Sequence, residues 1–134
     1  MKAVVIVACG MTLALFSTPA WVHHSYATFD TTRHVSVTGT VTEFNWTNPH
    51  ASFKVSAVNA AGAAEIWSVE MGSPNNLIRE GWRRTSLKLG DKVTVTMAPL
   101  RDGRRGGSYV GIVLANGKAL GKPAPPHSAP VVIR

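Results

Sequence analysis

Residues 35–46 read VSVTGTVTEFNW, and their valines alternate with polar residues at a period of two. Alternation of β-branched apolar residues with polar ones predicts a strand that buries one face. Gly39 interrupts this strand, and the apolar phase changes between Val41 and Phe44, which predicts a bulge near Glu43. A strongly bent first strand of this kind is typical of small closed barrels.

Four more segments carry strand signals, and one carries the signals of a helix. The additional strands are predicted at residues 52–57, 64–71, 92–97 and 108–114, with a basic loop over 101–107. Ser73 suits a helix cap and Pro74 the first helical position, so a helix of about two turns is predicted to end at Gly81.

The order of these elements is three strands, a short helix and two strands. This order predicts a mainly β domain over residues 34–117, built as a five-stranded OB-like barrel with the helix between strands three and four. The alternative is a small β-sandwich with a decorating helix. Residues 21–33 are expected to form an N-terminal arm. Residues 118–134 contain four prolines and are expected to form an extended or disordered tail.

Residues 1–20 have the layout of a secretory signal peptide. Lys2 precedes an apolar run from Ala3 to Phe16, and small residues up to Ala20 offer a cleavage site. The run is shorter than the roughly 20 residues that span a bilayer. We therefore expect a bacterial protein exported to the periplasm or the medium, with no transmembrane segment after signal cleavage.

The cysteine content and the net charge of the chain limit which metals and ligands the protein is expected to bind. The single cysteine, Cys9, lies inside the signal and at a poor position for lipoprotein cleavage, so the exported chain is expected to hold neither a disulfide nor a thiolate-bound metal. The formal charge of the chain is +7, and it falls to +6 when signal cleavage removes Lys2. A basic surface attracts anions in general. Export argues against nucleic acid as the partner.

Histidines near the start of the exported chain suggest a metal site. Cleavage after Ala20 would place His23 third in the chain, where a free amine, two amides and an imidazole can enclose Cu(II) or Ni(II) in a square plane. His24 would add an axial donor, and His50 would join if the arm folds back. The alternative is two ordinary exposed histidines at a flexible terminus and a turn histidine that binds a backbone carbonyl.

Glu70 is unusual because it lies in an apolar strand just before the predicted helix. Free N–H groups at a helix start favour a carboxylate or a bound anion. One interpretation is a polar pocket of Glu70, Ser73 and Asn75. The alternative is a structural ion pair of Glu70 with Arg79 or Arg83. No second carboxylate stands at a matching position, so acid–base catalysis by a pair has no support.

Basic residues form two clusters beside aromatic ones. The clusters are Arg79, Arg83, Arg84 and Lys88 around the helix end, and Arg101, Arg104 and Arg105 in the last loop. With Trp46 and Trp82 they would form a face for a small molecule, an anionic glycan or a lipid. A solvated basic face without a specific partner is the alternative.

Four motifs resemble a known family. They are His23-His24-Ser25-Tyr26, Trp46-Thr47-Asn48-Pro49-His50-Ala51, Glu70-Met71-Gly72-Ser73-Pro74-Asn75 and Gly81-Trp82. Together they are similar to a family of exported bacterial proteins of unknown function. The resemblance implies that the motifs meet in space, and it implies no activity, catalytic residue or ligand. In relatives the paired histidines follow the signal directly, whereas Trp21 and Val22 intervene here.

These observations predict a non-enzymatic, exported binding module. Copper is the first candidate metal, and the predicted ligands are His23, His24 and His50. The residues predicted to bind other ligand groups are Trp46, Asn48, Glu70, Ser73, Asn75, Trp82 and Arg83. The alternatives are a small-molecule, glycan or lipid site on the Trp/Arg face, an accessory subunit of a periplasmic complex, and, last, a hydrolase-like enzyme using Glu70 and His50.

Overall fold

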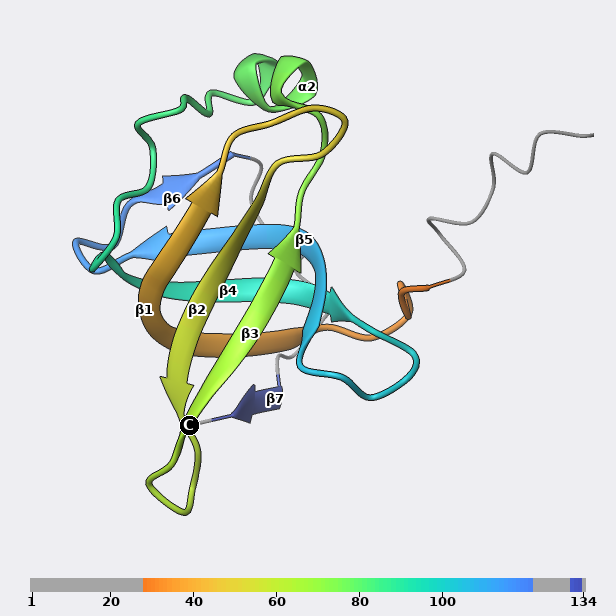
Figure 1. Ribbon diagram of the computed structural model, residues 1–134, viewed down its shortest axis with the longest axis vertical. Helices are drawn as coiled ribbons and strands as arrows, with labels where there is room; N and C mark the ends of the chain where they lie inside the picture. The colour runs from red at the N-terminus through yellow and green to blue at the C-terminus, as the bar shows by residue number, and fades with distance from the viewer. Residues whose placement is uncertain (1–27, 122–130, 134) are drawn as a thin grey trace, which may run out of the picture.

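The protein, seen in a computed structural model that describes residues 28–121 and 131–133, is mainly β (Figure 1). A single helix in the described part, α2 (Pro74–Arg79), lies between the third and fourth strands. The strands are β1 (Val35–Asn45), β2 (Ser52–Val58), β3 (Ala64–Glu70), β4 (Lys92–Pro99), β5 (Gly106–Leu114), β6 (Ala119–Leu120) and β7 (Val131–Ile133).

Five strands close into a barrel in the order β2-β3-β5-β4-β1, with β1 pairing back onto β2. The first half of β1 pairs with β4 from Val35 to Thr40, and the second half pairs with β2 from Thr40 to Asn45. Within this barrel only β3 and β5 run parallel. The predicted OB-like barrel with one helix between strands three and four is confirmed.

The bend of β1 depends on Gly39 and on a bulge. The β1–β2 register shifts between Val41 and Glu43, where the change of apolar phase predicts it. A Cβ atom on Gly39 would lie 2.6 Å from Val55 Cγ1 and would also meet the backbone oxygen of Ser56. The bent strand can therefore cross β2 only at a residue without a side chain.

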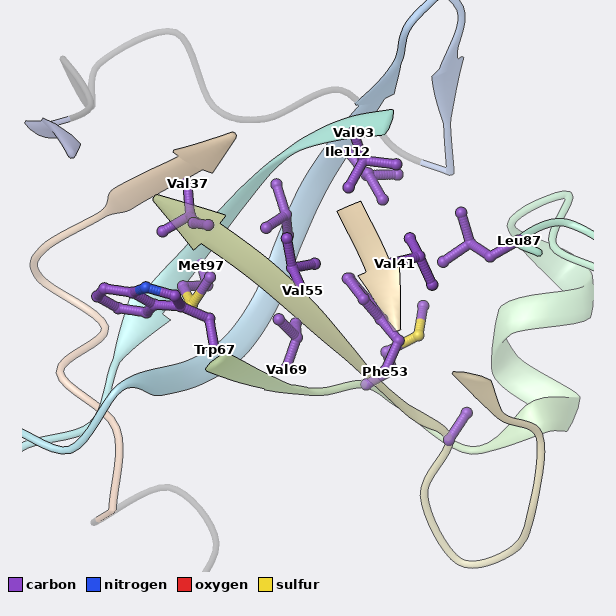
Figure 2. Packing of buried hydrophobic residues seen from close by; sticks show 14 of the residues in the cluster. Val37, Val41, Phe53, Val55, Trp67, Val69, Leu87, Val93, Met97 and Ile112 are labelled. Carbon is purple, nitrogen blue, oxygen red and sulfur yellow. The ribbon is translucent and has the colours of Figure 1, made fainter. Parts of the chain in front are cut away.

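Alternate residues of β1, β2, β3 and β4 fill the barrel interior together with Ile112 of β5, and Figure 2 labels members of this core. Fully buried members include Val37, Val41, Phe53, Val55, Val69, Val95 and Met97. The predicted alternation of β2, β3 and β4 is thereby confirmed. Burying one such side chain contributes roughly 1.5–3 kcal/mol. Leu87, from the segment after α2, is also buried in this core.

The helix begins and ends where the sequence predicts. The Ser73 side chain accepts a hydrogen bond from the Asn76 backbone, Pro74 occupies the first turn, and Leu77 is buried. Gly81 follows with a φ of 91°, in the left-handed region that favours glycine. Trp82 N then donates to Leu77 O at 2.9 Å, which turns the indole towards the core.

Trp82 belongs to an aromatic cluster near the helix. Its ring packs edge-on against Tyr109, with the two ring centroids 5.4 Å apart, and lies 6.5 Å from that of Phe44. The Tyr109 hydroxyl donates to Leu120 O at 2.9 Å. A Cβ on Gly121 would lie 2.7 Å from Trp82 Nε1, so the chain after β6 passes directly over the indole.

Three segments depart from the expected boundaries. Gly106 and Gly107, predicted in the basic loop, belong to β5; a Cβ on Gly106 would lie 2.5 Å from the backbone oxygen of Ser68 in β3. In the expected N-terminal arm, Phe29 is buried and bridges to Leu100. In the expected tail, β6 pairs with β5 and β7 pairs with β1, while residues 122–130 and 134 fall outside the described part.

The described part of the chain holds no helix that is both long and apolar enough to cross a membrane.

Replacing Gly39 by alanine should destabilise the barrel by about 2–3 kcal/mol, because the new methyl group overlaps β2 backbone and Val55. The matched control is Gly72→Ala, since a Cβ there meets nothing within 4 Å. We expect the control to shift the free energy of unfolding by less than about 1 kcal/mol. Urea unfolding of both variants measures the difference. Equal midpoints would contradict the role given to Gly39.

Tyr109 should make stability depend on alkaline pH, because burial raises the pKa of its hydroxyl to about 12. An unfolded tyrosine ionises near pH 10, so the native state favours the neutral form. This contribution is complete below about pH 10 and is lost as the pH rises through 12. The free energy of unfolding of the wild type should therefore fall more steeply between pH 10 and 12 than that of Tyr109→Phe.

The check on Tyr109 is urea unfolding of both proteins at pH 8, 10 and 11. At pH 8 we expect Tyr109→Phe to be less stable by about 1 kcal/mol, because the Leu120 carbonyl loses its donor. Parallel pH profiles for the two proteins would show that Tyr109 is not the responsible group.

Candidate functional site

The loop between β1 and β2 is held against the end of β3 by backbone hydrogen bonds. Ala51 N donates to Gly72 O at 3.1 Å, and Met71 N donates to Ala51 O at 2.9 Å. The β2–β3 register then continues with Ser52 opposite Glu70. Figure 1 shows this loop beside α2 at one end of the barrel. Two of the sequence motifs therefore meet here.

His50 and Glu70 form an ion pair at this junction. His50 Nδ1 lies 2.7 Å from Glu70 Oε1, and each side chain is 44% exposed. An N–H on Nδ1 directed at this carboxylate would leave Nε2 for another partner. This corrects two expectations: Glu70 pairs with His50 rather than with Arg79 or Arg83, and His50 binds a carboxylate rather than a backbone carbonyl.

The other polar candidates at this end have different surroundings. The Ser73 hydroxyl accepts from Asn76 N at 3.4 Å and so serves as the helix cap. Asn48 and Asn75 are exposed, and Trp46 is half-buried with its ring edge-on to Phe44. Trp46 and Asn48 lie on the turn after β1, and Ser73 and Asn75 lie at the entrance of α2.

Trp82 and Arg83 do not form the predicted ligand face. Trp82 is 0% exposed, which corrects the expectation that its ring is open for stacking. Arg83 Nη1 donates to Trp82 O at 2.8 Å and to Ile78 O at 3.3 Å, so its guanidinium satisfies carbonyls at the end of α2. The motif Gly81-Trp82 is explained by helix termination and core packing.

Within the described residues, the side chains that could ligate a metal ion form only an incomplete set. Over residues 28–121, no group of three or more His, Cys, Asp or Glu side chains is placed to hold an ion. His50 and Glu70 supply two donor side chains at most. His23 and His24, the other predicted ligands, fall outside the described residues.

A second candidate site is a groove of about 330 Å³ on the outer face of β2 and β3. Its lining residues are Thr28, Phe29, Ser52, Phe53, Lys54, Ser68, Val69, Glu70, Leu100, Arg104 and Gly107. Among them Glu70 was predicted as a site residue, and Arg104 was predicted as part of a basic face. The polar residues that alternate with apolar ones in β2 and β3 identify this outer face in the sequence. The wall of the groove comes from segments that are distant in sequence.

Comparison with known proteins identifies the family of the chain. No curated protein matches it. Among solved structures, the chain is similar to Rim1, a mitochondrial single-stranded DNA-binding protein from S. cerevisiae, with 12% sequence identity and a TM-score of 0.47. That match covers 61% of this chain and 92% of Rim1. The model of a family of unknown function, DUF6152, matches residues 11–109. With most of its length matched, the chain belongs to the DUF6152 family.

Proposed function

We propose that this protein is an exported, non-enzymatic binding module that holds a divalent metal ion, copper(II) first, with His50 as an oriented ligand. The observation that carries the proposal is the 2.7 Å contact between His50 Nδ1 and Glu70 Oε1. Metal-binding histidines commonly donate their second ring N–H to a carboxylate, which sets the tautomer and increases the basicity of the ligating nitrogen.

The His50–Glu70 pair has the features that such a ligand needs. The imidazole is 44% exposed, so an ion can approach it. The loop that carries His50 is tied to β3 through Ala51, which restrains the position of the ring. Orientation by Glu70 and restraint by the loop reduce the entropy that binding would cost.

The remaining ligands in the proposal are His23, His24 and the new N-terminal amine. Cleavage after Ala20 would create a chain start in which amine, amide and imidazole nitrogens suit the tetragonal preference of Cu(II). The exported chain would contain no thiolate, since Cys9 precedes the cleavage site. A nitrogen-rich set without sulfur favours Cu(II) over softer ions.

The glycan and lipid alternative, as predicted from Trp46, Trp82 and the neighbouring arginines, has lost its main support. Trp82 is buried in the core, and Arg83 is bonded to backbone carbonyls. The hydrolase-like alternative would use the same His50–Glu70 pair, in which the carboxylate would orient a general base. The metal proposal needs no further catalytic group, and we prefer it for that reason.

The metal proposal is tested with the exported protein, purified after expression of the full chain with its own signal. Mass spectrometry should give a mature chain that begins at Trp21. Titration with Cu(II), followed by visible d–d absorbance, should show saturable binding. His50→Ala and His23→Ala should each weaken binding at least tenfold, and Glu70→Gln should weaken it about 10–100-fold because the ring loses its charged partner.

The matched control is His127→Ala, which removes an imidazole that the proposed site does not use. Its titration should overlay that of the wild type. If His50→Ala and Glu70→Gln also overlay the wild type, the proposed ligand role of His50 is wrong, whatever the terminus binds.

A further inference from the structure

The groove on the β2–β3 face has a wall built from two segments that are distant in sequence. Asp30 N donates to Pro99 O at 2.8 Å, and Arg101 N donates to Thr28 O at 3.0 Å. These bonds join residues 28–30 to the start of the β4–β5 loop as a short ribbon. Leu100 N donates back to Gly106 O at 3.0 Å, which ties the ribbon to β5. The wall is therefore part of the hydrogen-bonded fold.

The floor of the groove is polar and has a regular spacing. Ser52 stands opposite Glu70, and Lys54 stands opposite Ser68, across the antiparallel β2–β3 ladder. Alternate residues of a strand share a face, so these four side chains lie together on the outside of the barrel. The floor thus offers two hydroxyls, an ammonium and a carboxylate within one hollow.

The two cations of the groove are held at its border by exposed ion pairs. Lys54 Nζ lies 2.7 Å from Glu43 Oε2, and Arg104 Nε lies 2.7 Å from Asp102 Oδ2. The hydrogen bond from Lys54 lowers the pKa of Glu43, so that pair stays charged at neutral pH. Exposed pairs of this kind are weak, and a ligand carboxylate can compete for the cation.

From this arrangement we propose that the groove binds an acidic oligosaccharide, a chain of hydroxyl-rich sugar rings that carry carboxylates. Ser52, Ser68 and Glu70 would hydrogen-bond sugar hydroxyls, and Lys54 and Arg104 would attract the carboxylates. Leu100 lines the wall and supplies an apolar contact for a ring face. In closed barrels of this topology, the second and third strands form the surface on which oligomeric ligands lie.

The same residues disfavour a single-stranded nucleic acid in this groove. Such ligands need aromatic side chains on which bases stack, together with a track of cations. The two aromatic lining residues, Phe29 and Phe53, are only 8% and 1% exposed. The groove would offer hydroxyl groups to the edge of a base, but it has no exposed aromatic ring on which the base could stack.

This proposal is independent of the metal proposal, although Glu70 borders both sites. The experiment therefore uses the exported protein in the presence of a chelator. Isothermal titration calorimetry measures binding of tetragalacturonate, of a neutral galactose oligomer of the same length, and of a thymidine oligonucleotide. The variants are Lys54→Met, which removes the floor cation, and Ser68→Tyr, which fills the groove. Lys118→Met, which removes an exposed cation outside the lining, is the charge-matched control.

The expected result is binding of the acidic sugar in preference to the neutral one, with affinity at least tenfold lower in Lys54→Met and Ser68→Tyr. Lys118→Met should bind as the wild type does. Urea unfolding checks that each variant is folded. If Ser68→Tyr is unfolded, the result with Lys54→Met decides alone. Failure of the wild type to bind, an equal loss in Lys118→Met, or tighter binding of the oligonucleotide would each overturn the proposal.

Discussion

The bend in β1 is the constraint on which the barrel depends, because a single strand must pair with β4 over its first half and with β2 over its second. Gly39 makes the bend sterically possible, and the bulge between Val41 and Glu43 changes the side-chain phase so that Phe44 packs against the core. With β1 bent in this way, the sheet closes without an exposed edge between β1 and β2, and inward-facing side chains of β1 to β5 enclose one core.

Closure also decides where the functional candidates lie. It brings the β1–β2 loop to the end of β3, where Ala51 exchanges backbone hydrogen bonds with Met71 and Gly72 and places His50 beside Glu70. The same closure turns the outer face of β2 and β3 towards the ribbon of residues 28–30 and 99–101. The ion pair and the groove therefore share one face of the barrel and one residue, Glu70.

Local patterns predicted the fold well because the relevant signals are short-range. Alternation identified β1 to β4, the phase change at Glu43 identified the bulge, and Ser73, Pro74 and Gly81 marked the helix. The site was harder to predict, since the pairing of His50 with Glu70 follows from the β2–β3 register. Trp82 was misjudged because its burial depends on Tyr109 and on the chain after β6, which are distant in sequence.

The most direct measurement of the central claim is the tautomer of His50, read from long-range proton–nitrogen NMR correlations of the imidazole rings at a pH where they are neutral. His50 Nδ1 lies 2.7 Å from Glu70 Oε1, and a neutral ring that donates from Nδ1 to a carboxylate has a bare Nε2. We expect the Nδ1–H form for His50 in the folded protein and its loss in Glu70→Ala. Observation of the Nε2–H form in the wild type would contradict it.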